Sequence, residues 1–445
     1  MTQNNRRWTI MVYMAGDNGK VFQQLQGKPL MAPMEAQGYQ DIAEMEAVGS
    51  TPDVAVLVQF DTLSDREHTY RIYIRPSEEP RQIEYIPEQN MGDPRALRDF
   101  IVWGIENYPA ENYAVILWNH GTGWKEDDIY AFARSRGLQV QASEDEVRSA
   151  LRAAPQASLT RNNRRLSRAF FLSSITEVLQ LDDEDSRAIA FDDSSLDFLD
   201  NAKLQQAFQE AEAITGKKVS LIGMDACLMG MVEVAYQLRT NANYMVASQE
   251  VEPLSGYPYT AILQNLTTHP EMTSEALAKL IVQEYGRYYE GESRGSVAQI
   301  TQSATNLRLI EKLADSLGRL AVILGQLVAE EDIYTEKALY HAQRKAVRFK
   351  DSDFVDLCDF LKVLQDKYTG DSDELTQVID EVMNLMTFEV EPQLILANVT
   401  SGVRFERVKG LSIYSPVRGY SQFYERSDFA GCGWGEFLQR LNDLV

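Results

Sequence analysis

Residues 221–230 read LIGMDACLMG, and this stretch decides the expected fold. It contains the end of an apolar run, 219–224, which Asp225 and Cys227 follow directly, and a helix-like run, 231–238, comes next. A short run that is apolar throughout is typical of a strand buried on both faces of a sheet. Ligands of α/β sheets bind beyond the carboxyl ends of the strands, so Asp225 and Cys227 are candidate site residues.

Comparable runs recur through the first half of the chain. Apolar strands are expected at 9–14, 54–60, 113–118 and 244–248, and helices between them at 39–48, 93–107 and 203–213. Buried strands that alternate with helices predict a mostly parallel sheet flanked by helices, which is an α/β fold. Residues 125–187 break this rhythm and are interpreted as an insertion.

The later part of the chain has a different pattern. Helices are expected at 274–290, 306–330, 333–347, 353–366 and 373–387, with strands near 401–405 and 411–415 and a last helix at 434–441. The sequence therefore predicts three parts: a core at 1–304, a mainly helical subdomain at 305–390, and C-terminal strands and a helix at 391–445 that pack on the core.

Composition restricts the function classes. The chain has 66 acidic against 43 basic residues and a formal net charge of -23, which disfavours nucleic-acid partners and favours basic peptides. No apolar run approaches the roughly 20 residues of a membrane span. The run WTIMVYMA, at 8–15, is short for a signal peptide, and three widely spaced cysteines do not indicate a disulfide framework. We expect a cytoplasmic protein without a membrane segment.

A second strand end supplies a partner for the thiol. Residues 113–124, YAVILWNHGTGW, place His120 and Gly121 after an apolar run. Imidazole is the usual proton acceptor for a nucleophilic thiol, and a glycine N–H there can stabilise an oxyanion. The alternatives are a buried structural cysteine at Cys227 and a histidine that only caps a strand.

Metal and cofactor chemistry have little support in the sequence. Paired Cys or His spacing, HExxH and a phosphate-binding glycine loop are all absent from the sequence. The acidic runs 182–185 and 192–193 do not match the spacing of an EF-hand loop. We expect no cofactor, and a calcium requirement stays open.

Several segments together carry a resemblance to a known family. They are WTIMVYMAGDN (8–18), DIAEMEAVGS (41–50), YAVILWNHGTGW (113–124), AIAFDDSSLDFLDNAKL (188–204), IGMDACLMGMVEVAYQL (222–238), YMVASQEVEPLSGYPY (244–259) and GLSIYSP (410–416). In this order they resemble the clostripain family of cysteine peptidases. The resemblance implies a caspase-like α/β fold, a Cys–His dyad and cleavage after basic residues. It makes Cys227 the nucleophile and His120 the group that transfers protons.

The spacing of the dyad agrees with that resemblance. His120 precedes Cys227 by 107 residues, and by 44 when the 63 residues of 125–187 are set aside. Caspases place the histidine roughly 50 residues before the nucleophile. The local motif Asp-Ala-Cys-Leu nevertheless differs from the caspase Gln-Ala-Cys.

Acidic residues near the nucleophile suggest a substrate preference. Residues two apart in a strand share a face, so Asp225 is expected beside Cys227, where it would pair with an Arg or Lys side chain at P1. The resemblance implies the same role. Ser248 and Glu250 follow the next strand and are weaker candidates for the same pocket, as is Glu252. The alternative for Asp225 is an ordinary capping or ion-paired carboxylate.

The insertion carries a basic cluster: Arg161, Arg164, Arg165 and Arg168. Members of the family are commonly matured by a cut between the histidine and cysteine segments, so this cluster is a candidate processing site for the enzyme itself or for an activating protease. A solvated loop is the alternative. The expected function is a cysteine endopeptidase that cleaves peptide and protein substrates after Arg or Lys and is made as a zymogen. A non-catalytic caspase-like scaffold that binds a basic peptide is the alternative.

Overall fold

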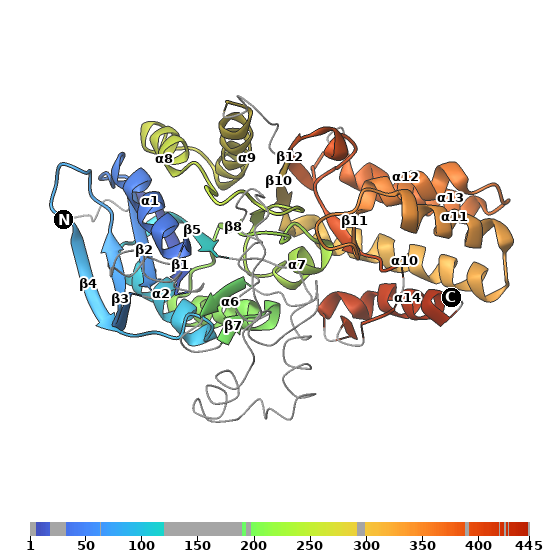
Figure 1. Cartoon of the computed structure of the whole chain (residues 1–445), viewed down its shortest axis with the longest axis horizontal. Helices are drawn as coiled ribbons and strands as arrows, with labels where there is room; N and C mark the ends of the chain where they lie inside the picture. The colour runs from blue at the N-terminus through green and yellow to red at the C-terminus, as the bar shows by residue number, and fades with distance from the viewer. Residues whose placement is uncertain are drawn as a thin grey trace, which may run out of the picture. The chain divides into compact units, whose positions relative to one another are not determined.

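A computed structural model describes residues 6–17, 33–62, 64–119, 189–192, 197–291, 299–387, 391–417, 419–421, 424–425 and 427–443 (Figure 1). The chain divides into two compact units. The first comprises Met1–Cys227 and Glu252–Met272, and the second Leu228–Val251 and Thr273–Val445. The division thus falls at Leu228, directly after the candidate nucleophile, and differs from the boundary between core and helical subdomain that the sequence predicted at 304/305.

The first unit is built on a mostly parallel sheet. Its strands are β1 (Arg6–Gly16), β2 (Val54–Thr62), β3 (Asp65–Tyr73), β4 (Gln82–Pro87), β5 (Ala110–Trp118) and β8 (Leu221–Asp225). Their order is β8-β5-β1-β2-β3-β4. β8, β5, β1 and β2 are parallel, and β3 and β4 add antiparallel strands beyond β2. The four parallel strands are the ones that the apolar runs predicted.

Helices cover both faces of this sheet. They are α1 (Pro33–Glu46), α2 (Pro94–Asn107), α6 (Asn201–Thr215) and α8 (Tyr259–Thr268), and a hairpin of β6 (Ile189–Asp192) and β7 (Asp197–Leu199) precedes α6. Gly38 of α1 lies against Met14 of β1, whereas Gly104 of α2 lies against Met11. Residues 11 and 14 point to opposite faces of a strand, so α1 and α2 lie on opposite sides. Figure 1 shows α8 on the side of α1 and α6 on the side of α2.

Helix α2 begins where the sequence predicted. The side chain of Asp93 accepts a hydrogen bond from the Arg95 N–H at 2.8 Å, and Pro94 occupies the first helical position. A carboxylate cap satisfies an amide that has no partner within the helix, and proline is compatible with the first turn. Asp93 therefore caps the helix that was expected at 93–107.

The second unit combines a small antiparallel sheet with helices. β10 (Ile300–Asn306) pairs with β9 (Tyr244–Ala247) and β12 (Ile395–Ser401), and β11 (Phe354–Asp356) pairs with β13 (Ser412–Tyr414). Its helices are α7 (Val232–Gln237), α9 (Ser274–Gly291), α10 (Ile310–Ala329), α11 (Ile333–Lys345), α12 (Leu357–Lys367), α13 (Asp373–Met386) and α14 (Trp434–Asp443). The α/β fold with a mainly helical C-terminal region is confirmed.

Two local predictions in this unit were wrong. The strand expected at 401–405 ends at Ser401, because Gly402 adopts a φ of 96° and a short 3₁₀ helix, Val403–Phe405, follows. The helix expected from 353 begins only at Leu357, since 354–356 pair with β13 and Asp356 caps the helix. Among the helices that the structure describes, none is long and apolar enough to cross a membrane.

Candidate active site

The candidate site begins at the ends of two neighbouring parallel strands. Trp118, the last residue of β5, lies opposite Asp225, the last residue of β8. The N–H of Asn119 donates to the Asp225 carbonyl at 3.4 Å. His120 follows Trp118 by two residues, and Cys227 follows Asp225 by two. His120 and Gly121 lie outside the described residues, so the dyad itself stays a prediction.

The thiol of Cys227 is buried. Cys227 exposes 1% of its surface. The Glu252 N–H donates a hydrogen bond to its Sγ at 3.3 Å. A donor at sulfur favours the thiolate, which is the nucleophilic form. The donor at the sulfur is an amide of the later segment 252–272.

The backbone turns sharply after the thiol. Leu228 has a φ of 60°, and among the described non-glycine residues only Glu331 shares a positive φ. For an L-residue this conformation costs roughly 1–2 kcal/mol. The Leu228 N–H donates to the Glu250 carbonyl at 3.2 Å, which helps to keep the turn. Strained backbone of this kind is concentrated at functional sites in proteins.

The Asp225 carboxylate lies inside the first unit. Asp225 is fully buried, and its Oδ2 accepts a hydrogen bond from the Tyr259 hydroxyl at 2.9 Å. The neighbouring Tyr257 hydroxyl donates to the Met224 carbonyl at 3.2 Å. Strand β8 ends at Asp225, so strand alternation alone does not fix the direction of Cys227.

Ser248 and Glu250 belong to the second unit and are bonded within it. The Ser248 hydroxyl donates to the Glu250 carbonyl at 2.9 Å and lies 3.0 Å from the hydroxyl of Thr301. The Glu250 carboxylate accepts from the N–H groups of Val251 at 2.9 Å and Lys350 at 3.2 Å, and burial raises its pKa above the usual range. These contacts shape the loop after β9, and a role in substrate binding stays a prediction.

Three carboxylates gather elsewhere in the first unit. Oxygens of Asp17, Asp61 and Glu88 lie within 4.8 Å of one another, and both aspartates are buried. Thr69 donates its hydroxyl hydrogen to Asp61 at 3.2 Å. Oxygen ligands at this spacing suit a hard cation such as calcium, so these residues are the place to examine a calcium requirement.

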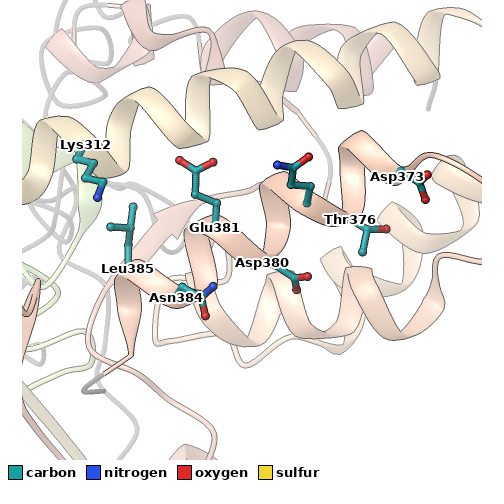
Figure 2. Close-up of a pocket in the computed structure, with 8 residues that line it drawn as sticks. Lys312, Asp373, Thr376, Asp380, Glu381, Asn384 and Leu385 are labelled. Atoms are coloured by element: carbon teal, nitrogen blue, oxygen red, sulfur yellow. The ribbon is translucent and has the colours of Figure 1, made fainter. Parts of the chain in front are cut away.

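The second unit carries a polar surface pocket of about 670 Å³ between α10 and α13. Figure 2 shows its lining, which comprises Lys312, Asp373, Thr376, Gln377, Asp380, Glu381, Asn384 and Leu385. Glu381 is paired with Arg319 and accepts from the Ser316 hydroxyl at 2.8 Å. The lining holds no cysteine or histidine, so this pocket is not the candidate catalytic centre.

Comparison with known proteins identifies the family of the chain. The sequence matches the profile of the clostripain family of C11 peptidases over residues 31–156 and 177–438, which is most of its 445 residues. The chain belongs to the clostripain family. The expected resemblance is thereby confirmed. The unmatched stretch between these segments falls within the insertion and contains all four arginines of the basic cluster, which lie outside the described residues.

Relatives of known sequence and structure agree with this membership. Clostripain from Hathewaya histolytica is 30% identical over 185 residues, which are 40% of this chain but only 25% of that protein. A secreted C11 cysteine protease from Bacteroides thetaiotaomicron, solved with an irreversible peptide inhibitor, superposes with a TM-score of 0.58 at 17% identity. It covers 96% of this chain and 99% of its own. An inactive zymogen C11 protease from Parabacteroides distasonis gives 0.59 at 18% identity, covering 97% and 99%. These structures establish the shared caspase-like fold.

Sequence reasoning missed two contributors to the site of this clostripain-family chain. One is the Glu252 amide at the thiol, because backbone donors carry no residue signature. The other is Tyr259. The sequence Gly256-Tyr-Pro-Tyr259 was a usable signal, since buried tyrosines need partners for their hydroxyls.

Proposed function

We propose that the chain is a cysteine endopeptidase that hydrolyses peptide bonds after Arg or Lys. Family membership supports the reaction class, and one geometric observation supports the site. The last residues of β5 and β8, Trp118 and Asp225, lie side by side in parallel register. The segments leading to His120 and to Cys227 therefore leave the sheet at the same edge, as an α/β catalytic site requires.

The proposed reaction has two halves. The Cys227 sulfur attacks the carbonyl carbon of the P1 residue, and its proton passes to His120, which protonates the leaving amine as the C–N bond breaks. Water, deprotonated by His120, then attacks the carbonyl carbon of the resulting thioester. The C–S bond breaks, the acid product leaves, and His120 returns the proton to the Cys227 sulfur. The N–H groups of Cys227 and Gly121 stabilise the oxyanion in both halves.

Asp225 selects the basic P1 side chain in this proposal. A buried carboxylate is a strong electrostatic partner for Arg or Lys because the surrounding dielectric is low. Asp225 is fully buried and lies two residues before the nucleophile. Peptides and proteins with basic residues are therefore the proposed substrates, and Ser248 and Glu250 remain candidates for further substrate contacts.

The uncut chain is proposed to be latent. Cys227 exposes 1% of its surface and Asp225 none, so a peptide carbonyl does not reach the thiol without a rearrangement. We propose that a cut in 125–187, after Arg161, Arg164, Arg165 or Arg168, activates the enzyme, made by the enzyme itself or by an activating protease. A cytoplasmic location and independence from cofactors complete the proposal, and assays with calcium and with EDTA test a metal requirement.

Covalent labelling tests the proposed site. A peptide acyloxymethyl ketone with Arg at P1 is added to the cut protein, and the adduct is located by mass spectrometry. We expect one adduct on Cys227 in the wild type and none in Cys227→Ala. Labelling of Cys358 or Cys432 instead, or an unlabelled wild type that binds the peptide reversibly, would overturn the proposal and favour a non-catalytic peptide-binding scaffold.

A further inference from the structure

The buried carboxylate of Asp225 accepts a hydrogen bond from a tyrosine of a later segment. Tyr259, the first residue of α8, exposes 1% of its surface and donates its hydroxyl hydrogen to Oδ2 at 2.9 Å. A tyrosine hydroxyl has a single hydrogen to donate, and Tyr259 gives it to this carboxylate. Carboxylates taken out of water need such donors, so the pair is a built feature of the first unit.

We propose that Tyr259 is a positioning residue that fixes the plane of the Asp225 carboxylate and thereby favours Arg over Lys at P1. The inference rests on the proposed function, in which Asp225 binds the P1 side chain. It assigns the choice between the two basic residues to a group outside the dyad.

The physical reason lies in the different shapes of the two cations. The terminal torsion of an aspartate is broad, so its carboxylate plane rotates unless something holds it. A guanidinium binds both oxygens through two parallel N–H bonds and needs that plane fixed, whereas an ammonium acts as a point charge. A carboxylate accepts about four hydrogen bonds, so the phenol contact is compatible with a bound guanidinium.

Tyr259 is itself held in place. The hydroxyl of Thr260 donates to the Glu44 carbonyl at 3.0 Å, which ties the start of α8 to α1. The ring centroids of Tyr257 and Tyr259 lie 6.3 Å apart, within the range of aromatic pairs. Because backbone and ring are both anchored, the hydroxyl presents its hydrogen to Asp225 from a fixed position.

The chain supplies a matched control two residues away. Tyr257 is equally buried and also donates its hydroxyl hydrogen to the end of β8, but to the Met224 carbonyl, at 3.2 Å. Tyr257→Phe removes the same atom and a comparable bond, but one that goes to a backbone carbonyl. This variant therefore shows how the loss of a buried tyrosine hydrogen bond affects the enzyme through its structure alone.

The test compares kcat/KM for two peptides that differ only in Arg or Lys at P1, in the cut enzyme. For Tyr259→Phe we expect the value for Arg to fall on the order of tenfold and that for Lys by less than about threefold. Tyr257→Phe keeps the wild-type Arg/Lys ratio even if its melting midpoint falls. Both kcat/KM values of a variant are measured on the same preparation. Partial misfolding therefore lowers the two values by the same factor and leaves the Arg/Lys ratio unchanged.

Other outcomes separate this inference from the proposed function. A wild type that cleaves both peptides, with an Arg/Lys ratio that Tyr259→Phe leaves unchanged, overturns the role of Tyr259 alone. A cut wild type that cleaves neither peptide overturns the proposed function as well. Tyr259→4-aminophenylalanine, which keeps an N–H donor at the para position of the ring, is the second variant. Its ratio is expected above that of Tyr259→Phe, and an equally low ratio counts against positioning by a hydrogen bond.

Discussion

At the scale of single residues, the second unit contains a buried carboxyl that responds to pH. Glu233, in the first turn of α7, accepts hydrogen bonds from the Tyr414 N–H and the Tyr424 hydroxyl, both at 2.9 Å. Burial raises the pKa of Glu233 to about 7, since desolvation penalises the charged form. The folded protein therefore prefers the neutral carboxyl more strongly than the unfolded chain does.

This preference predicts a pH-dependent stability. The stabilising contribution of neutral Glu233 is fully present below its ordinary pKa near 4.5 and is lost as pH rises through about 7. Glu233→Gln keeps a neutral side chain of the same shape at every pH. Its free energy of unfolding, relative to that of the wild type, therefore rises by up to about 3 kcal/mol between pH 4.5 and 8.

Melting midpoints at pH 5 and pH 8 check the prediction for Glu233. We expect the midpoint of Glu233→Gln minus that of the wild type to rise between the two pH values. The exposed Glu330 provides the control, because Glu330→Gln should show the same difference at both. A difference for Glu233→Gln that is equally independent of pH would contradict the raised pKa.

At the scale of elements, a close backbone approach fixes the segment after Cys227. The Gly230 N–H donates to the Ser248 carbonyl at 2.7 Å, and the Ser412 N–H donates to the Gly230 carbonyl at 2.9 Å. A Cβ on Gly230 would lie 2.9 Å from the backbone nitrogen of Gln249 and from the carbonyl carbon of Ser248. Real Cβ atoms do not come this close to backbone, so one of the segments has to move.

Gly230→Ala is therefore expected to destabilise the second unit by roughly 1–3 kcal/mol, the usual cost of overpacking. Gly431→Ala is the control, because a Cβ there meets nothing within 4 Å. Thermal unfolding of both variants measures the effect. Equal melting midpoints for the two variants would show that the backbone around Gly230 moves to accommodate the methyl group without loss of stability.

The elements that sequence patterns could predict are those with long or uniformly apolar runs. The parallel strands and the helices α9–α11 and α13 stand close to their expected ranges. Helix α8 was missed because it follows Pro258 and has no side-chain cap, and its sequence is rich in threonine. Strand β4 was missed because QIEYIP is short, is largely exposed and ends in a proline.

The candidate site was predictable only in part, and for a physical reason. Asp225 and Cys227 follow an apolar strand, and this local pattern is visible in the sequence. The contact between Tyr259 and Asp225 joins residues 34 apart, and the Glu252 amide reaches a sulfur 25 residues earlier. Such contacts arise from tertiary packing, which periodicity does not encode.

At the scale of the whole molecule, the proposed latency predicts that the active enzyme is a chain cut within 125–187. Wild type and Cys227→Ala are expressed side by side and analysed by intact mass. If the enzyme processes itself, the wild type yields two fragments with the first ending at Arg161, Arg164, Arg165 or Arg168, whereas Cys227→Ala stays intact. Fragments from both proteins, or from neither, would argue against an autocatalytic cut.

The most direct test of the central claim is hydrolysis of fluorogenic peptides by the cut protein. The chain is nicked within the segment 157–176 by trypsin, which is then blocked with a serine-protease inhibitor that spares thiols. Peptides with Arg, Lys or Leu at P1 are assayed with wild type, Cys227→Ala and Asp225→Asn. We predict that the wild type prefers Arg and Lys over Leu by on the order of a hundredfold or more, that Asp225→Asn loses most of this preference, and that Cys227→Ala is inactive. A nicked wild type that hydrolyses none of the peptides, or a Cys227→Ala as active as the wild type, would contradict the account.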